Sequence, residues 1–175
     1  MRENVDVGKE ISKLAILHIF QLMNFFVIID NVNFCYFKLL HAILPPSSNM
    51  VKGKRLKYTI ADSQVAFTIE VSSASEIENL NVDRSQPTIC AVGTKFNFKQ
   101  FIVLFDASQF VFKTCLSAVD FCFKIFNIYN LSYVEKCTNV WVFVQHFCYD
   151  LPIKNKNPPV QTFINDIFTH ISNDK

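Results

Sequence analysis

Sulfur and imidazole side chains are the first candidates for chemistry in this chain. His146 and Cys148 stand one residue apart, and Cys115 or Cys122 could complete a zinc site with them. Structural zinc sites usually use two pairs of closely spaced ligands flanked by turn residues. A single pair inside an apolar stretch does not meet that pattern, so we expect no metal ion and no other cofactor.

The sequence supports nucleophilic or acid–base catalysis no better than it supports a metal site. Cys122 and His146 could form a thiolate–imidazole couple, but that chemistry needs a partly exposed cysteine, and Cys122 lies on the apolar side of a predicted helix. Glu76 and Glu78 are two residues apart on another predicted helix, so their carboxylates diverge. The sequence contains no G-x-S-x-G, Walker, G-x-G-x-x-G or H-E-x-x-H motif. We therefore expect that the protein is not an enzyme.

The helix predicted for residues 117–130 carries its polar side chains on one narrow stripe: Ser117, Asp120, Lys124 and Asn127. Apolar side chains from Leu116 to Tyr129 cover the rest of its circumference. Such a helix must be surrounded by other elements, so it marks the centre of a core. Asp120 and Lys124 are four residues apart with the acid first, which predicts a surface ion pair at the solvent edge of this helix.

The composition is that of an apolar chain large enough for one domain with appendages. Of its 175 residues, 50% are hydrophobic and 18% charged, and it has 19 phenylalanines against 3 glycines. Scarce glycine argues against Gly-rich phosphate-binding loops. The six cysteines lie mostly in apolar runs, which predicts small core residues in a reducing compartment. We therefore expect an intracellular protein, cytoplasmic or nuclear.

The first 55 residues differ in pattern from the rest. Residues 1–44 form an apolar segment in which we expect two helices, ended by Pro45-Pro46. The apolar run over residues 14–29 is shorter than the about 18–20 residues that cross a membrane. Residues 45–55 read as a linker that holds most of a basic cluster, formed by Lys52, Lys54, Arg55 and Lys57.

Residues 56–151 predict an α+β domain. We expect a small, mainly antiparallel sheet packed against two apolar helices, with additional N- and C-terminal helices outside this range. The predicted strands are residues 56–60, 65–71, 88–92, 101–105 and 110–113, the last two joined by a four-residue loop. A short helix is expected at residues 73–80. The stretch 137–149 could be a strand or a helix, and its length and apolar spacing favour the helix.

Residues 152–175 predict a polar spacer and an amphipathic helix. Val160, Phe163, Ile164, Ile167, Phe168 and Ile171 recur at helical spacing along one face. The stripe could pack on its own domain or dock in a groove of a partner protein. In the second case Phe163, Ile167 and Phe168 would carry the contact.

Several stretches within residues 86–145 resemble the C-terminal region of a group of uncharacterised insect proteins. They are Gln86-Pro87-Thr88-Ile89, Val92-Gly93, Phe105-Asp106, the run from Ala118 to Phe126, and the run from Val140 to Gln145. The similarity covers about residues 56–151 and departs from the group at Val134, where the relatives have a proline. No activity is established for that group, so the resemblance implies none here.

These patterns together favour a protein-interaction module with an unidentified protein partner. The candidate interaction surface comprises the basic cluster of residues 52–57 and the three side chains of the C-terminal helix. Two alternatives come from other classes. A membrane-associated protein would be anchored by residues 14–44. A nucleic-acid-binding domain would use the basic cluster together with the sheet, where aromatic and basic side chains interleave.

Overall fold

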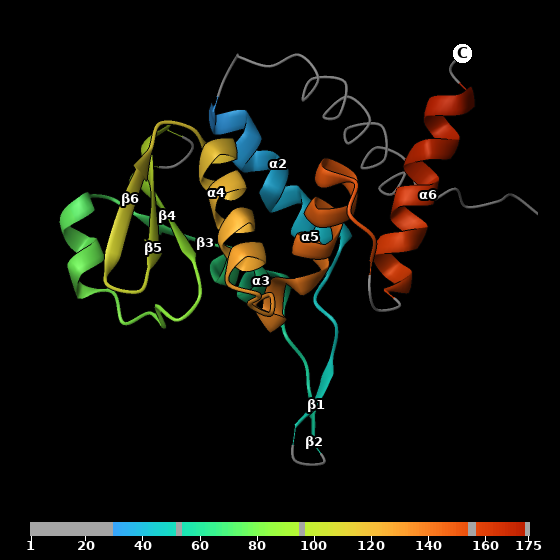
Figure 1. Cartoon of the computed structure of the whole chain (residues 1–175), viewed down its shortest axis with the longest axis horizontal. Coiled ribbons are helices and arrows are strands. Elements are labelled where there is room, and N and C mark those ends of the chain that lie inside the picture. The colour runs from blue at the N-terminus through green and yellow to red at the C-terminus, as the bar shows by residue number, and fades with distance from the viewer. Residues whose placement is uncertain (1–29, 52–53, 95–96, 154–156, 174–175) are drawn as a thin grey trace, which may run out of the picture.

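The computed structural model describes residues 30–51, 54–94, 97–153 and 157–173 (Figure 1). It confirms the α+β class. A four-stranded sheet has the order β3-β4-β5-β6, in which β3 and β4 are parallel and the other pairs antiparallel. Its strands are β3 (Thr68–Val71), β4 (Thr88–Thr94), β5 (Asn97–Phe105) and β6 (Ser108–Phe112).

The α-helices lie to one side of this sheet, and a separate two-stranded hairpin extends from the body of the protein (Figure 1). The α-helices are α2 (Asp30–Ile43), α3 (Ile60–Phe67), α4 (Cys115–Ile128), α5 (Thr138–Phe143) and α6 (Pro158–Asn173). Three shorter helical segments are η1 (Ala74–Asn79), η2 (Glu135–Cys137) and η3 (Val144–Cys148), and the hairpin pairs β1 (Asn49–Val51) with β2 (Lys54–Leu56).

The sheet is covered on both faces because its central strands are apolar on both. Ile89 and Ala91 of β4 face the main core, whereas Cys90 and Val92 face a smaller cluster built around Ile77 of η1. This alternation is what a pleated strand imposes. The crossover between the parallel strands β3 and β4, which contains η1, therefore covers one face, and α2 and α4 cover the other.

Helix α4 behaves as its sequence predicts. Thr114 caps its first turn by accepting a hydrogen bond from the backbone N–H of Ser117. Seven of its side chains are buried, and the predicted polar stripe faces solvent wholly or in part. The expectation fails only at its end, where Ile128 is 76% exposed and Tyr129 is 61% exposed.

Helix α2 belongs to the main core, which corrects the predicted division of the chain at residues 45–55. Phe34, Phe37, Leu40 and Leu44 are buried in the same cluster as α4 and the sheet. The helix ends at Pro45-Pro46 as expected. The other predicted N-terminal helix, residues 14–29, lies outside the described residues. Within the part of the chain that the structure describes, no helix is long and apolar enough to cross a membrane.

The segment predicted as a linker is ordered into the β1–β2 hairpin in the residues that are described. Its entry is fixed by Asn139 of α5, whose side-chain amide donates to the carbonyl of Pro45 at 2.6 Å. The same Asn139 accepts a hydrogen bond from Asn157, which caps the first turn of α6. One buried amide thus joins three segments that are distant in sequence.

Two predicted strands are wrong in their type or extent. The predicted strands are residues 56–60 and 65–71, but helix α3 occupies residues 60–67, so only Leu56, at the end of β2, and Thr68–Val71 are in strands. A capping box starts the helix: Thr59 accepts from the N–H of Asp62, and the Asp62 carboxylate accepts from the N–H of Thr59. This local helix-starting signal outweighs the preference of the segment's β-branched residues for a strand.

The predicted β5–β6 hairpin is present, with a two-residue turn rather than a four-residue loop. Phe105 pairs with Ser108, and Asp106 adopts a left-handed conformation with φ 54°. Aspartate tolerates this conformation better than most residues, which permits the tighter turn. The two strands are consequently longer than the sequence suggests, and β6 begins at Ser108.

The stretch 137–149 is helical as expected. It runs from η2 through α5 into η3, whose last turn is widened to a π-helix. Gln145 secures this turn, since its side-chain amide donates to the carbonyl of Pro152 and its backbone carbonyl accepts from the N–H of Leu151.

We predict that Phe34→Ala lowers the free energy of unfolding by about 3–5 kcal/mol, because Phe34 packs on Phe98 and Phe101 in a site without solvent. Leu39→Ala on the same helix is the matched control. Leu39 is 39% exposed, and its truncation should cost less than about 1 kcal/mol. Chemical denaturation of the full chain measures both values, and equal losses would show that α2 is not part of the core.

Candidate functional site

The candidate metal ligands do not converge. Cys115 and Cys122 are buried in the main core, while Cys148 lies on η3 at the surface. Among the described residues, no group of three His, Cys, Asp or Glu side chains is arranged to hold a metal ion. Burial raises the pKa of the Cys122 thiol well above its usual value, which disfavours the thiolate that a nucleophile or metal ligand needs.

Asp120 and Lys124 form the predicted ion pair, with 2.6 Å between Lys124 Nζ and Asp120 Oδ2. The structure adds Tyr149, whose hydroxyl donates to Asp120 Oδ1 at 2.5 Å and whose ring stacks on Phe123. Partial burial alone would raise the pKa of Asp120, but the hydrogen bonds from Lys124 and Tyr149 outweigh it and lower that pKa. Both carboxylate oxygens are thus engaged: the Tyr149 bond joins α4 to the end of η3, and the Lys124 pair lies within α4.

A serine–imidazole pair, which the sequence analysis missed, lies between α2 and α3. His41 Nδ1 is 2.7 Å from Ser63 Oγ, the arrangement by which a base activates a serine nucleophile. The two residues are 22 positions apart in sequence with no motif around either, so only the packing of α2 on α3 brings them together.

The surroundings of His41 and Ser63 do not suit a catalytic role for this pair. His41 is 1% exposed and Ser63 0%, and the ring of Phe67 packs edge-on against the imidazole at 5.1 Å. Burial, assisted by the nearby Lys38 ammonium, lowers the pKa of His41 to about 4. The imidazole is therefore neutral at physiological pH and shielded from any substrate in solution. Inside the core, the imidazole is the hydrogen-bond partner that the buried Ser63 hydroxyl needs.

The predicted basic cluster lies on and next to the β1–β2 hairpin. Lys54 and Arg55 are in β2, and Lys57 follows it with an exposed side chain. Lys52 is outside the described residues. The cluster and the sheet stand on separate parts of the fold, because the hairpin extends away from the body that contains β3 to β6 (Figure 1).

The apolar stripe of α6 is mostly internal, which corrects its expected role as an outward docking face. Phe163 and Ile167 are buried in the main core, and Phe163 lies 5.4 Å from Phe143 of α5. Of the three candidate contact residues on this helix, Phe168 alone is exposed, at 55%, and it lies beside Phe147. Packing on its own domain, the other alternative for this stripe, accounts for the arrangement.

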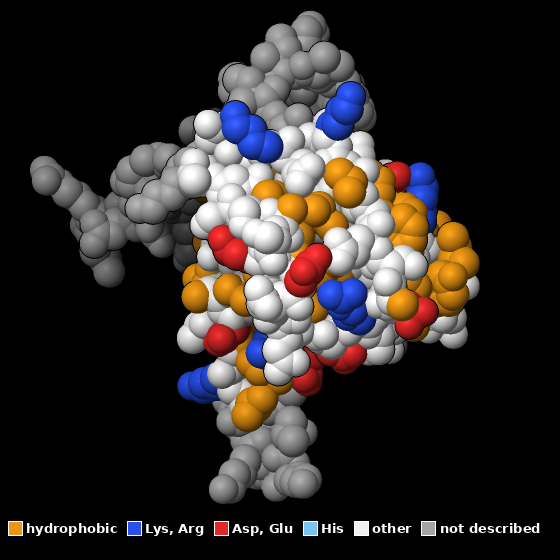
Figure 2. Space-filling model, turned by 90° about the vertical axis from the view of Figure 1, so that its left-hand side faces the viewer, with side chains coloured by type: hydrophobic (Ala, Val, Ile, Leu, Met, Phe, Trp, Pro, Cys, Tyr) orange, Lys and Arg blue, Asp and Glu red, His pale blue; other side chains and the backbone are white. Residues whose placement is uncertain are grey.

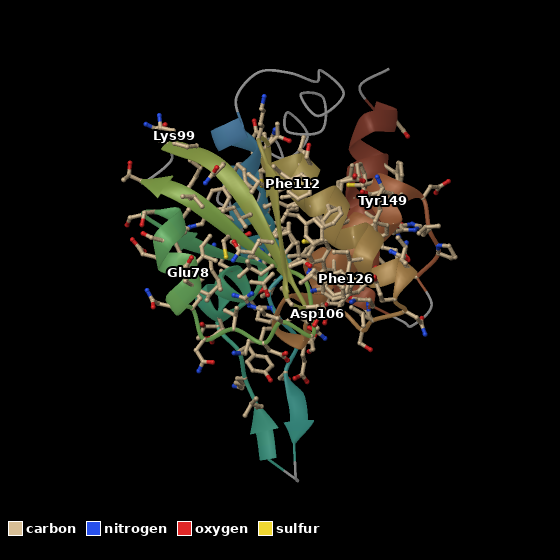
Figure 3. All side chains as sticks on the ribbon, turned by 60° about the vertical axis from the view of Figure 1, so that its left-hand side comes forward. Glu78, Lys99, Asp106, Phe112, Phe126 and Tyr149 are labelled. Atoms are coloured by element: carbon tan, nitrogen blue, oxygen red, sulfur yellow. The ribbon has the colours of Figure 1, made fainter. Side chains whose placement is uncertain are left out.

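A set of exposed and half-buried apolar side chains lies instead where β6 meets α4. This β6–α4 surface is formed by Phe110 and Val111 of β6 with Phe121, Ile128 and Tyr129 of α4 and its C-cap. Hydrophobic side chains are densest at the corresponding right-hand edge of Figure 2. Figure 3 shows Phe112 between the sheet and α4, and Asp106 at the end of the sheet near the end of that helix.

Ring contacts join the sheet to α4 and its C-cap at two places on this surface. Phe121 contacts Phe110 at 4.7 Å and Phe112 at 5.1 Å, and Tyr129 contacts Phe105 at 5.1 Å. Phe110 is 36% exposed and lies on the helix side of the sheet, because it pairs with the core residue Val103. Val111 is 64% exposed on the opposite side, next to Ile102. The surface therefore extends around both faces of one strand.

That strand is an edge of the sheet. Among the described strands, only β5 pairs with β6. Successive residue pairs of an antiparallel ladder alternate in their hydrogen bonding, so every second residue of β6 directs its N–H and C=O away from β5. An edge of this kind is a template for another strand unless charge, proline or a bulge blocks it. Ser108–Phe112 contains no charged residue and no proline.

Comparison with known proteins adds no relative: no protein-family model, no curated protein and no solved structure matches the chain. The resemblance to the insect proteins stays a prediction. The β6–α4 surface is accordingly identified by its geometry alone. Sequence reasoning predicted the hairpin but not its exposure, because burial of either face of β6 depends on elements distant in sequence.

The buried imidazole predicts a specific dependence of stability on pH. The pKa of His41 is about 4 in the folded chain and about 6.5 when unfolded. As the pH falls from about 6.5 to about 4, the unfolded state binds the proton first, so folding loses up to about 3 kcal/mol. Above about pH 6.5 the imidazole is mostly neutral in both states, so the full stability is retained there.

The measurement is the free energy of unfolding between pH 4 and 7 for the wild type and for His41→Gln. Carboxylates titrate in both proteins, so the informative quantity is the difference between the two curves. The wild type should lose about 3 kcal/mol more than the variant over this range. Parallel curves would contradict the low pKa of His41.

Proposed function

We propose that this protein is a non-enzymatic, intracellular protein-interaction module that binds an extended segment of a partner along β6. The observation that carries the proposal is the open edge of β6, uncharged and bordered by exposed Phe110 and Val111. Four of the six cysteines are buried, as small core residues of a protein in a reducing compartment are, and this supports the intracellular location.

Binding by strand addition uses two kinds of contact. The backbone groups on the free edge of β6 would pair with those of the incoming strand, and alternate side chains of that strand would contact the two sides of the surface. On the helix side they would meet Phe110 and Phe121, and on the other side Val111. The segment that fits best is extended, short and apolar at alternate positions.

The opposite edge of the sheet shows how an edge is protected in the same protein. Strand β3 carries Glu70, whose carboxylate pairs with Lys38 of α2. A charged side chain disfavours the approach of a second apolar strand. Only β6, of the two edge strands, lacks such a charge, so the difference between the edges supports β6 as the binding edge.

A random-peptide library selected on the immobilised full chain tests the proposal. We expect the enriched peptides to have apolar residues at alternate positions and to bind Val111→Lys at least about tenfold more weakly, because a lysine on the edge opposes strand addition. Binding is measured by titration calorimetry with one selected peptide.

Val65→Lys is the matched control. Val65 is 62% exposed on α3, against 64% for Val111 on β6. Both substitutions should leave the free energy of unfolding within about 0.5 kcal/mol of the wild type, since neither removes a buried contact. Peptides that bind all three proteins equally would exclude β6 as the binding edge.

A further inference from the structure

We propose that the strand added to β6 is the β6 strand of a second copy of this chain. The inference rests on the proposed function and names its partner. Two β6 strands would pair antiparallel about a two-fold axis at Phe110 and join the two sheets into one.

The residues of β6 suit this pairing. With Phe110 opposite its counterpart, Gln109 faces Val111 and Ser108 faces Phe112, so the five positions of the strand set no charges against each other. The two Phe110 rings would lie on the same side of the joined sheet, each already in contact with Phe121 of its own α4. Aromatic residues directly opposite each other stabilise antiparallel pairs.

The charges that flank β6 are complementary in the same register. Asp106 precedes the strand and Lys113 follows it, and both are exposed. Antiparallel pairing about Phe110 sets Lys113 of one copy opposite Ala107 of the other, next to Asp106. The two-fold axis creates this opposite-charge contact twice. Parallel pairing would instead place like charges at each end, so the charges select the antiparallel arrangement.

The short length of β6 limits the affinity of the proposed dimer. A pair of five-residue strands with Phe110, Phe121 and Val111 forms a small interface, and small interfaces belong to transient complexes. We therefore expect monomer and dimer to exchange at micromolar concentrations or above, rather than a permanent dimer.

Sedimentation equilibrium of the full chain, from low micromolar to high micromolar concentration, tests the inference. The wild type should show a reversible monomer–dimer equilibrium. Val111→Lys should raise the dissociation constant at least about tenfold, whereas the control Val65→Lys should stay within about twofold of the wild type.

A charge series tests the register. Lys113→Glu sets two acidic side chains together twice and should weaken the dimer about tenfold or more. Adding Asp106→Asn to that variant removes the repulsion and should recover part of the affinity. Asparagine suits this site because it tolerates the left-handed backbone of residue 106.

A monomer throughout this range, or a dimer that neither Val111→Lys nor Lys113→Glu weakens, would overturn self-pairing. These results leave the proposed function standing if selected peptides still bind β6. Loss of the peptide binding alone, with an edge-dependent dimer, would restrict the function to self-association.

Discussion

The aromatic cluster around Trp141 is the interaction on which the rest of the fold depends. Trp141 of α5 contacts Phe67 of α3 at 4.8 Å and Phe126 of α4 at 5.0 Å, and Phe67 in turn stacks on Phe37 of α2. Each of four helices thus contributes a ring to one cluster. Rings of this size bury more apolar area than any other side chain, so they set how the helices are placed relative to one another.

The same cluster decides which chemical groups meet solvent. By packing α2 on α3 it encloses His41 and Ser63 together, where the imidazole stays neutral and serves the core. Helix α4 packs on the sheet from one side, which leaves the outer edge of β6 uncovered within the described residues. The proposed function therefore rests on the outer edge of β6, which pairs with no other described strand.

The elements that could be predicted are those encoded within a short segment of the sequence. The helix α4, the β5–β6 hairpin and the helical character of residues 137–149 could be predicted, because each is encoded by a periodic pattern or a turn within a short segment. The helix α3 could have been found from its capping box at Thr59 and Asp62. The burial of α2 in the core could not be predicted. The two prolines that follow this helix are compatible both with a linker and with a packed hairpin.

The sequence by itself determined the α+β class, the buried face of α4 and its solvent-facing ion pair, because these depend on spacing along one element. The tertiary structure alone decided that His41 meets Ser63, that Phe163 and Ile167 turn inward, and that β6 is an open edge. Each of these depends on which residues of distant elements come within contact distance, and the sequence pattern of one element carries no information about the surface that another presents to it.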